Sequence, residues 1–452
     1  MLEDKRIAAR LSPASRRGVT RIVREKVDLY RERLAGGENI GAEGLLESIR
    51  DEVFREIEAV GRGTMRVINA TGVVLHTNLG RAVLGDRANE VLSMVASGYT
   101  DLETDLPTGE RVHRDRRAAR LVSLLTGAES AIVVNNTAAA VLLAVDTFAG
   151  RGAVAVSRGE LVEIGGSFRL PEILRSAAGA VIEIGTTNRT RIGDYEAAID
   201  QGATLLLKVH TSNFRIVGYT ETVSLAELAR LGKNRNVPVM YDQGNGILLP
   251  LDRAGLEGEE DVASLLESGV DMISFSGDKV LGGPQAGITV GAASCIDRMR
   301  GNHLSRALRV DKLTLACLEV ALGEYWDGSS SGIPALRMIK EPLEDIRKRA
   351  SKLAGALKGA GAGAEISLEE GESSIGGGSF PVDPLPTVLV SIGLDGGGAV
   401  KLSAYLRSLD PAVLARVRDR SVSIDMRTVS GHEEDILTQS LLAGIETISG
   451  RE

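Results

Sequence analysis

The sequence has very little cysteine and few aromatic residues. Only Cys295 and Cys317 occur among its 452 residues, and Phe, Trp and Tyr together make up 3% of the chain. Two thiols exclude the disulfide-dense scaffold of a small secreted domain. We therefore expect a protein of a reducing compartment, the cytoplasm.

Long apolar runs are also missing. The chain begins with no apolar segment of the signal-peptide type, and no uninterrupted apolar run approaches the length that crosses a bilayer. A membrane-spanning helix needs roughly 20 such residues in succession. The sequence therefore predicts no association with a membrane.

A strong excess of one charge is absent from the chain as a whole. Its 53 basic and 61 acidic residues leave a net charge of -8, which argues against a protein that binds nucleic acid over its whole surface. The charge is uneven, because residues 5–33 contain ten Lys or Arg against three acids, a local charge of +7. This segment is either a surface for an anionic partner or a contact with an acidic neighbour in an oligomer.

The composition that remains is that of a large globular protein. With 43% apolar and 25% charged residues, 452 residues exceed the size of one ordinary core, so two or three domains are expected. Interleaved charged and apolar residues predict a helical N-terminal module at 1–62, broken at Gly36-Gly37. We expect a large α/β domain at 63–329 and a small α+β domain at 330–452. In the small domain we expect a charged helix near 340–360 and a Gly-rich loop at 371–379.

Six short apolar runs within 63–329 alternate with helical stretches. They read SAIVVNN, GAVAVSRG, GAVIEIG, ATLLLKVHTSN, VPVMYDQGNG and VDMISFSG. Such alternation is typical of a mainly parallel sheet covered by helices. Ligands of these sheets bind beyond the carboxyl ends of the strands. The residues that follow each run are therefore the candidates for chemistry.

The residues at these strand ends match the needs of a pyridoxal phosphate enzyme. Asp242 follows VPVMY, Lys279 follows MISFSGD, and Asn135-Asn136-Thr137 follows AIVV and opens a helix. In such enzymes a lysine forms a Schiff base with the cofactor, an aspartate keeps the pyridine nitrogen protonated, and a helix N-terminus receives the phosphate. We assign catalytic roles to Lys279, Asp242 and Asp278, and predict no metal site. The cofactor-binding candidates are Asn135, Asn136, Thr137, His210, Asp242, Asn245, Ser276 and Lys279.

Each of these residues also has an ordinary structural explanation. Asp242 alone is typical of a turn or cap, Lys279 of an exposed strand end, Asn-Asn-Thr of a helix N-cap and His210 of a structural histidine. Their joint occurrence at successive strand ends favours the cofactor site, because all the ordinary explanations would have to hold together.

Several longer blocks of sequence resemble a known family. The blocks are RVINATGVVLHTNLGRA at 66–82, SRGELVEIGGSFRLP at 157–171, KVHTSNF at 208–214, SGDKVLGGPQAGI at 276–288 and RALRVDKLTL at 306–315. They resemble the bacterial selenocysteine synthases, the L-seryl-tRNA(Sec) selenium transferases. The resemblance runs from about residue 60 to DMRTV at 425–429.

The resemblance implies a fold-type-I pyridoxal phosphate-dependent transferase. Such an enzyme converts L-seryl-tRNA(Sec) into L-selenocysteinyl-tRNA(Sec) with selenophosphate, by eliminating water to an aminoacrylyl intermediate and adding selenium to it. Arg81, Arg306 and Arg309 would then bind selenophosphate, and the last two share one face if their segment is helical. The resemblance also implies a homo-oligomer based on dimers, and suggests a decamer.

The resemblance implies a role in tRNA binding for the basic segment at 5–33. Structured RNA is recognised largely through its shape and phosphates, so the segment would dock the tRNA body. The candidate contacts are Arg16, Arg17, Arg21, Arg24 and Lys26.

Two other functions stay open on the sequence alone. One is a related lyase of the same fold that acts on a small amino acid or amino-sugar acid without tRNA. The other is an RNA-binding or scaffold protein that has kept the fold without its chemistry. Lys279, Asp242 and the Asn135 loop together argue against the scaffold.

Overall fold

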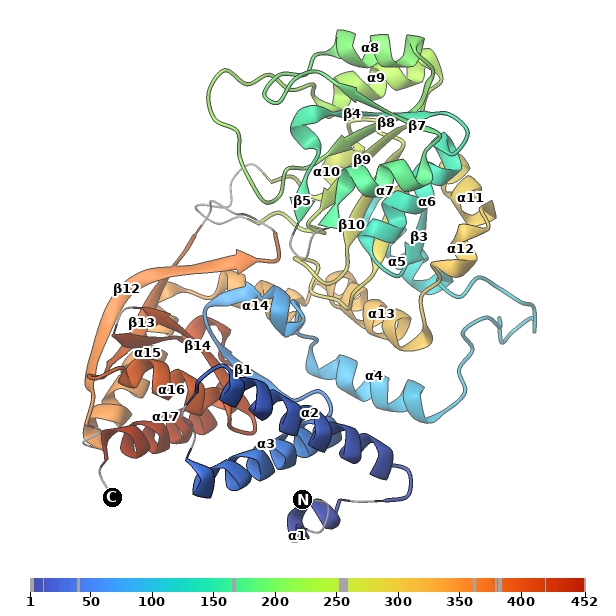
Figure 1. Cartoon of the computed structure of the whole chain (residues 1–452). Coiled ribbons are helices and arrows are strands. Elements are labelled where there is room, and N and C mark those ends of the chain that lie inside the picture. The colour runs from blue at the N-terminus through green and yellow to red at the C-terminus, as the bar shows by residue number, and fades with distance from the viewer. Residues whose placement is uncertain are drawn as a thin grey trace. The chain divides into compact units, whose positions relative to one another are not determined.

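The computed structural model describes residues 4–10, 12–38, 41–164, 168–251, 259–360, 363–378, 380, 384–418 and 420–450. The chain forms two compact units, one of residues 1–68 with 408–412 and the other of residues 69–407 with 413–452 (Figure 1). The domain boundaries predicted at 63 and 330 stay predictions. Within the described residues, no helix is both long enough and apolar enough to cross a membrane.

The first unit is built from helices, which confirms the predicted helical N-terminal module. Its helices are α1 (Lys5–Ala8), α2 (Arg16–Ala35) and α3 (Ala42–Arg62). Apolar residues at helical spacing form its core, namely Ile7, Val19, Tyr30, Ile49 and Val53. The helix α2 ends at the expected glycine pair, where Gly37 has a φ of +89° that favours glycine.

The second unit contains a seven-stranded, mainly parallel sheet. All six apolar runs form strands: β3 (Ser130–Val134), β4 (Ala153–Ser157), β7 (Ala180–Ile184), β8 (Ala203–Val209), β9 (Val239–Gly244) and β10 (Met272–Ser276). The strand order is β3-β11-β10-β9-β8-β4-β7, and β11 (Gly287–Gly291) runs antiparallel to both of its neighbours. The sequence analysis missed β11, although its three β-branched residues between two glycines are typical of a strand.

Helices cover both faces of this sheet. The apolar core on one face involves α6 (Thr137–Ala149), α7 (Leu170–Ala177) and α11 (Ala293–Gly301). The core on the other face involves α5 (Arg116–Thr126), α8 (Ile192–Asp200), α9 (Leu225–Arg235), α10 (Val262–Leu266) and α13 (Lys312–Trp326). The remaining elements of this part of the chain are α4 (Asp86–Ser97), α12 (Leu304–Ala307) and the short strands β5 (Glu163–Ile164) and β6 (Phe168–Arg169). Central strands buried on both faces explain why their sequences are nearly continuous apolar runs.

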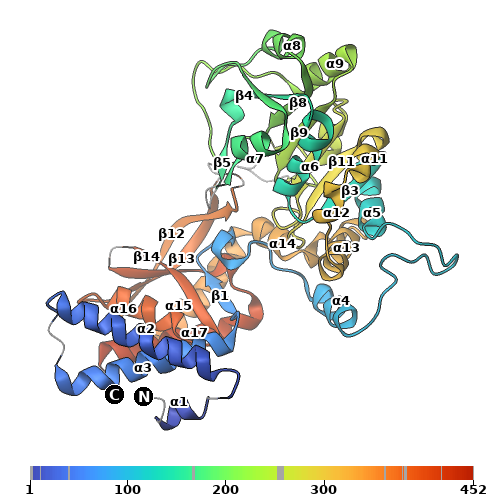
Figure 2. The same ribbon diagram turned by 45° about the vertical axis from the view of Figure 1, so that its right-hand side comes forward.

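A second, six-stranded sheet is formed mainly by the C-terminal part of the chain. Its order is β1-β14-β15-β13-β12-β2, with β1 (Val67–Ala70), β14 (Ala412–Arg418), β15 (Ser421–Asp425), β13 (Leu385–Gly393), β12 (Glu365–Gly376) and β2 (Val73–Leu75). Its helices are α14 (Pro334–Lys340), α15 (Leu343–Gly359), α16 (Gly398–Arg407) and α17 (Glu434–Ser449), and the last three lie together beside the sheet (Figure 2). The helix expected near 340–360 is therefore confirmed as α15. The early residues 73–75 belong to this sheet, because β2 pairs in parallel with β12.

The prediction of a Gly-rich loop at 371–379 is wrong for residues 371–376, because they form the end of β12. Gly371 pairs with Thr387 of β13, and Gly376 pairs with Leu75 of β2. At Gly376 a Cβ atom would lie 2.6 Å from a side-chain carbon of Val73. Glycine here allows two strands to approach closely, so it does not mark a loop. Residue 379 lies outside the described residues.

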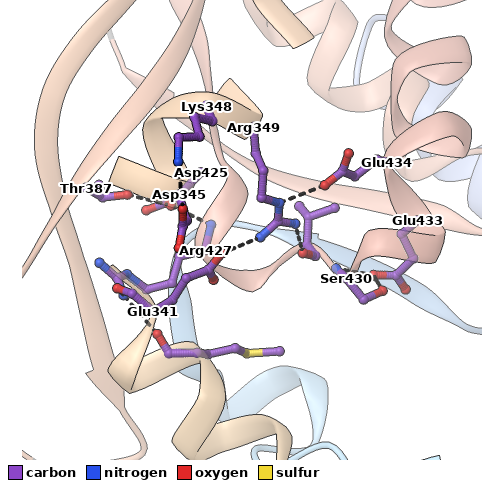
Figure 3. Close-up of polar contacts among 12 residues, drawn as sticks. Glu341, Asp345, Lys348, Arg349, Thr387, Asp425, Arg427, Ser430, Glu433 and Glu434 are labelled. Atoms are coloured by element: carbon purple, nitrogen blue, oxygen red, sulfur yellow. Dashed lines mark hydrogen bonds and ion pairs between the residues drawn. The ribbon is translucent and has the colours of Figure 1, made fainter. Parts of the chain in front are cut away.

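A buried polar cluster joins the strands of this second sheet (Figure 3). The carboxylate of Asp425, which is fully buried, accepts hydrogen bonds from the hydroxyls of Ser373 at 2.7 Å and Thr387 at 2.9 Å and from the backbone N–H of Arg427 at 3.1 Å. The guanidinium of Arg427 donates in turn to Ser373 Oγ at 3.0 Å and to the carbonyl of Met338 at 2.8 Å. The family block DMRTV thus forms a structural lock between β15, β12, β13 and α14.

Candidate active site

Lys279 lies just beyond the carboxyl end of β10, on the wall of a cavity. It is buried, with 5% of its surface exposed, and it shares the cavity with Thr137, His210, Ser212, Asp242 and Ser276. Burial lowers the pKa of its ammonium group, although the negative charge of Asp242 opposes this effect. A lowered lysine pKa increases the fraction of neutral amine, which is the form that reacts with an aldehyde or accepts a proton.

Asp242 lies on the neighbouring strand β9, opposite Ser274 in the sheet register. The Ser274 hydroxyl donates to Asp242 Oδ1 at 2.8 Å. Burial raises the pKa of Asp242, while this hydrogen bond and the positive charges of Lys279 and His210 oppose the rise. The strand pairing therefore brings the predicted acid and the predicted lysine to one cavity, where both are pushed toward their neutral forms.

The loop from β3 to α6 supplies the helix N-terminus at this cavity. Asn136 is the N-cap of α6, and its side chain accepts from the backbone N–H of Ala139 at 2.9 Å. Thr137 Oγ1 lies 2.5 Å from Ser276 Oγ, and both residues line the cavity. Asn135 is anchored elsewhere, since its backbone N–H donates to the carbonyl of Leu308 at 3.0 Å. Of the predicted triplet, Thr137 lines the cavity and the two asparagines do not.

The residues at this cavity fit pyridoxal phosphate. The N-terminus of a 13-residue helix and two hydroxyl groups suit a phosphate. The partly buried carboxyl of Asp242 suits a pyridinium nitrogen, and the buried amine of Lys279 suits an aldehyde. The backbone also leaves space, because Gly244 has a φ of +75° and a Cβ atom there would lie 3.7 Å from Lys279 Nζ.

His210 and Asn245 meet at a residue that the sequence analysis missed. His210 lines the cavity, and its backbone N–H donates to the carbonyl of Asp242 at 2.9 Å. Its Nε2 atom lies 3.2 Å from Glu259 Oε1, and Asn245 Nδ2 donates to Glu259 Oε2 at 3.4 Å. Asn245 is fully buried and does not line the cavity. Glu259 follows none of the six apolar runs of the sequence, so the strand-end rule gives no signal for it. Ser212 lies two residues beyond His210, and the same rule could have found it.

Asp278 and Arg81, which are 197 residues apart in the chain, form an ion pair beside Lys279. Arg81 Nη1 lies 2.8 Å from Asp278 Oδ2. Arg81 follows the HTNLG turn with a φ of +64°, and its charge helps to lower the pKa of Lys279. Asp278, for which a catalytic role was predicted, does not line the cavity. Its contact with the site is the ion pair that holds Arg81 close to Lys279.

Arg306 and Arg309 lie at a different cavity from Lys279. They line a cavity of about 360 Å³ together with Glu103, Arg114 and Arg300, and Arg309 Nη1 lies 3.4 Å from Glu103 Oε1. The helix α12 ends at Ala307, so the predicted shared helical face does not extend to Arg309. Arg81 lines neither this cavity nor the one at Lys279, so the three arginines predicted for selenophosphate do not meet at either of them.

The five basic residues predicted for tRNA all lie on α2, but their environments differ. Arg16, Arg17, Arg21 and Arg24 are exposed. Lys26 is half-buried and lies 2.9 Å from Glu56 of α3, which raises its pKa. Lys26 thus ties the two helices together, whereas the four arginines point to solvent.

Comparison with known proteins identifies the family. The family model described as L-seryl-tRNA selenium transferase matches residues 67–430. The L-seryl-tRNA(Sec) selenium transferase of Carboxydothermus hydrogenoformans is 46% identical over 419 residues, covering 92% of this chain and 90% of the relative. The enzyme of that name from Moorella thermoacetica is 47% identical over 403 residues, covering 87% and 86% of the two chains.

Among solved structures, D-glucosaminate-6-phosphate ammonia-lyase is similar with a TM-score of 0.58. It is 20% identical, and the match covers 87% of this chain and 98% of that chain. At this identity the likeness supports the fold only, so it gives no support to the lyase alternative. The sequence matches confirm the resemblance drawn from the motifs. The chain therefore belongs to the L-seryl-tRNA selenium transferase family.

Proposed function

We propose that this chain converts L-seryl-tRNA(Sec) into L-selenocysteinyl-tRNA(Sec) in the cytoplasm, with selenophosphate as the selenium donor. Family membership supports the reaction class and the seryl-tRNA(Sec) substrate. The observation that carries the proposal is the buried Lys279, placed with Asp242 on the wall of one cavity. A lysine is costly to bury unless it is paired or reacts covalently.

Lys279 has two roles in this proposal, as the attachment point of pyridoxal phosphate and as the base for the seryl Cα proton. When bound, pyridoxal phosphate supplies an electron sink for the charge that develops at Cα. The lowered pKa of Lys279 suits the proton transfer, because a general base works best with a pKa near the operating pH. Asp242 keeps the pyridine nitrogen positive, while Thr137, Ser276 and the α6 N-terminus hold the phosphate.

The anionic selenium donor requires a cationic pocket. Arg81 beside Lys279 is one part of it, and Arg306 with Arg309 is the other part. Because Arg81 lies outside the cavity that Arg306 and Arg309 line, we assign at least one arginine to a site shared with a neighbouring copy. The protein would then be a homo-oligomer based on dimers, and family resemblance suggests a decamer.

The N-terminal unit docks the tRNA body in this proposal. Exposed Arg16, Arg17, Arg21 and Arg24 on α2 provide a row of phosphate contacts. Lys26 contributes less, since its ammonium group is held by Glu56. The catalytic unit would handle the aminoacyl end.

The direct test is to incubate the purified protein with seryl-tRNA(Sec) and selenophosphate and to analyse the amino acid released from the tRNA. Selenocysteine is the expected product. Release of serine alone, from protein that carries its cofactor, would contradict the proposal. Turnover of a free amino acid or amino-sugar acid would favour the lyase instead.

A further inference from the structure

Glu259 is an acidic residue beside the candidate cofactor site to which no role has yet been given. One carboxylate oxygen lies 3.2 Å from His210 Nε2, and the other accepts from Asn245 Nδ2 at 3.4 Å. The side chains of His210 and Glu259 are 22% and 15% exposed. Glu259 does not line the cavity with Lys279, whereas His210 does. The Glu259 carboxylate therefore contacts the cavity only indirectly, through His210.

The imidazole of His210 depends on this carboxylate. The backbone of His210 is fixed by its hydrogen bond to the Asp242 carbonyl at 2.9 Å, but the ring can still rotate about its side-chain bonds. Its Nε2 atom is buried and has no aligned hydrogen-bond partner within the described part of the chain. Glu259 Oε1 is the acceptor that a small rotation would align with it. A partner at one ring nitrogen fixes the proton on that nitrogen and leaves the other nitrogen with a defined role.

We infer that Glu259 is a positioning residue that orients His210 for the bound cofactor. Its carboxylate accepts the Nε2 proton of His210 and holds the ring against the cavity, and Asn245 keeps the carboxylate in place. The inference rests on the proposed function, because it takes the Lys279 cavity as the cofactor site. It adds a residue that acts on the cofactor only through His210.

The test measures cofactor affinity and not turnover. Cofactor-free protein is titrated with pyridoxal phosphate, and bound cofactor is followed by absorbance, for wild type, Glu259→Gln, His210→Asn and the double variant. A change of about tenfold corresponds to about 1.4 kcal/mol. We expect Glu259→Gln to weaken binding about tenfold in the presence of His210 and to change it little in the His210→Asn background. Residues that act as a unit show such non-additivity.

Two further variants separate positioning from folding. Glu260→Gln removes the adjacent, exposed carboxylate and should leave the affinity unchanged. Glu259→Asp keeps the charge and should recover part of the affinity that Glu259→Gln loses. Additive losses in the double variant, or an equal loss in Glu260→Gln, would overturn the inference. The titration needs neither tRNA nor selenophosphate, so a different selenium donor would leave this test unaffected. If the wild-type protein does not bind pyridoxal phosphate, the proposed function itself is contradicted.

Discussion

Asp242 and Asp425 are two aspartates of the same compact unit with opposite environments. Asp425 is fully buried and accepts three hydrogen bonds, from Ser373, Thr387 and the backbone of Arg427. Asp242 accepts one side-chain hydrogen bond from the described residues, that of Ser274, and it borders a cavity. Burial raises its pKa, so its charge is only partly compensated.

The difference separates a structural carboxylate, Asp425, from the one that we propose to be functional, Asp242. A buried charge that is fully hydrogen-bonded holds its neighbours in place and has little capacity left for a ligand. A buried charge with unmet hydrogen-bonding capacity costs stability, and such groups cluster where ligands bind. Lys279 belongs to the second type, since burial lowers its pKa beside the same cavity. Substitutions at both types of site test this distinction.

The largest effect is expected at Lys279. A general base alone contributes about 10²–10⁴-fold to a rate, and Lys279→Ala also removes the point of covalent attachment. We therefore expect transferase activity to fall by at least about 10⁴-fold, while thermal stability is kept or increased because a costly buried amine is lost. Initial rates with seryl-tRNA(Sec) and a thermal melt check both parts.

Chemical trapping tests the same assignment in the unmodified protein. Borohydride reduction followed by peptide mapping should place the pyridoxyl group on Lys279. Label on Lys208, which lies 3.0 Å from Glu160, or on Lys312 would contradict the assignment.

Asp242→Asn should reduce the rate by about 10²–10³-fold, within the range for a group that tunes proton transfer. The pyridine nitrogen loses the carboxylate that keeps it protonated, so charge at Cα is stabilised less well. The cofactor should still attach, because Lys279 is intact. Absorbance of bound cofactor together with single-turnover kinetics separates the two effects.

The same variant has a pH signature in the cofactor-free protein. Because the folded pKa of Asp242 is raised above its unfolded value of about 3.9, the unfolded state releases this proton first as the pH rises. Ionisation of Asp242 therefore costs stability at neutral pH, and the cost disappears as the pH falls below the unfolded pKa. We expect Asp242→Asn to be more stable than wild type at pH 7 and equal to it near pH 3. Denaturant titrations at the two pH values measure these free energies of unfolding. If the variant is less stable than wild type at pH 7, Asp242 is a stabilising structural carboxylate like Asp425.

Asp425→Ala should destabilise the protein by about 3–5 kcal/mol. Removing a buried carboxylate that accepts three hydrogen bonds leaves its donors without an acceptor, here the hydroxyls of Ser373 and Thr387 and the backbone N–H of Arg427. Cofactor attachment at Lys279 should survive at a temperature where the variant is folded. The midpoint of denaturant unfolding measures the loss, and a loss below about 1 kcal/mol would show that the cluster is not a lock.

Arg309→Ala should slow the addition of selenium about tenfold or more while cofactor affinity is unchanged, as expected for one charged contact to an anion. Arg111→Ala is the comparison, because Arg111 lines the same cavity and lies 2.8 Å from the same Glu103 carboxylate but is far more exposed, so a smaller loss is expected. Rates as a function of selenophosphate concentration make the comparison. Equal loss of cofactor binding and selenium addition would assign Arg309 a structural role.

The smallest effect is expected on α2. Replacing Arg16, Arg17 and Arg24 together by Gln should weaken tRNA binding and lower the slope of log K against log salt by up to about 3, one for each phosphate that an arginine no longer neutralises. Lys26→Gln is the comparison, because Lys26 is held by Glu56 and should change the stability of the helix pair more than tRNA binding. Unchanged salt dependence in the triple variant would favour an oligomer contact for this helix.

Much of this protein could be predicted from the sequence, for a local reason. The six main strands, the N-terminal helices and the helix at 343–359 follow from apolar periodicity and from glycines at their ends. Lys279 and Asp242 were found because the carboxyl ends of neighbouring parallel strands meet at one edge of a sheet. These features depend on residues close together in the chain or on a general rule of sheet geometry.

Only the tertiary structure decided the features that join distant parts of the chain. Arg81 meets Asp278 across 197 residues, Glu259 meets His210, and Gly376 enters a strand because β2 and β13 lie on either side of β12. Arg306 and Arg309 belong to a cavity apart from Lys279 because α12 ends before Arg309 and Glu103 holds its side chain. Local periodicity carries no information about such pairings. They follow from the way whole helices and strands pack together. A single ion pair or close backbone approach then favours one packing over others that local sequence patterns do not distinguish.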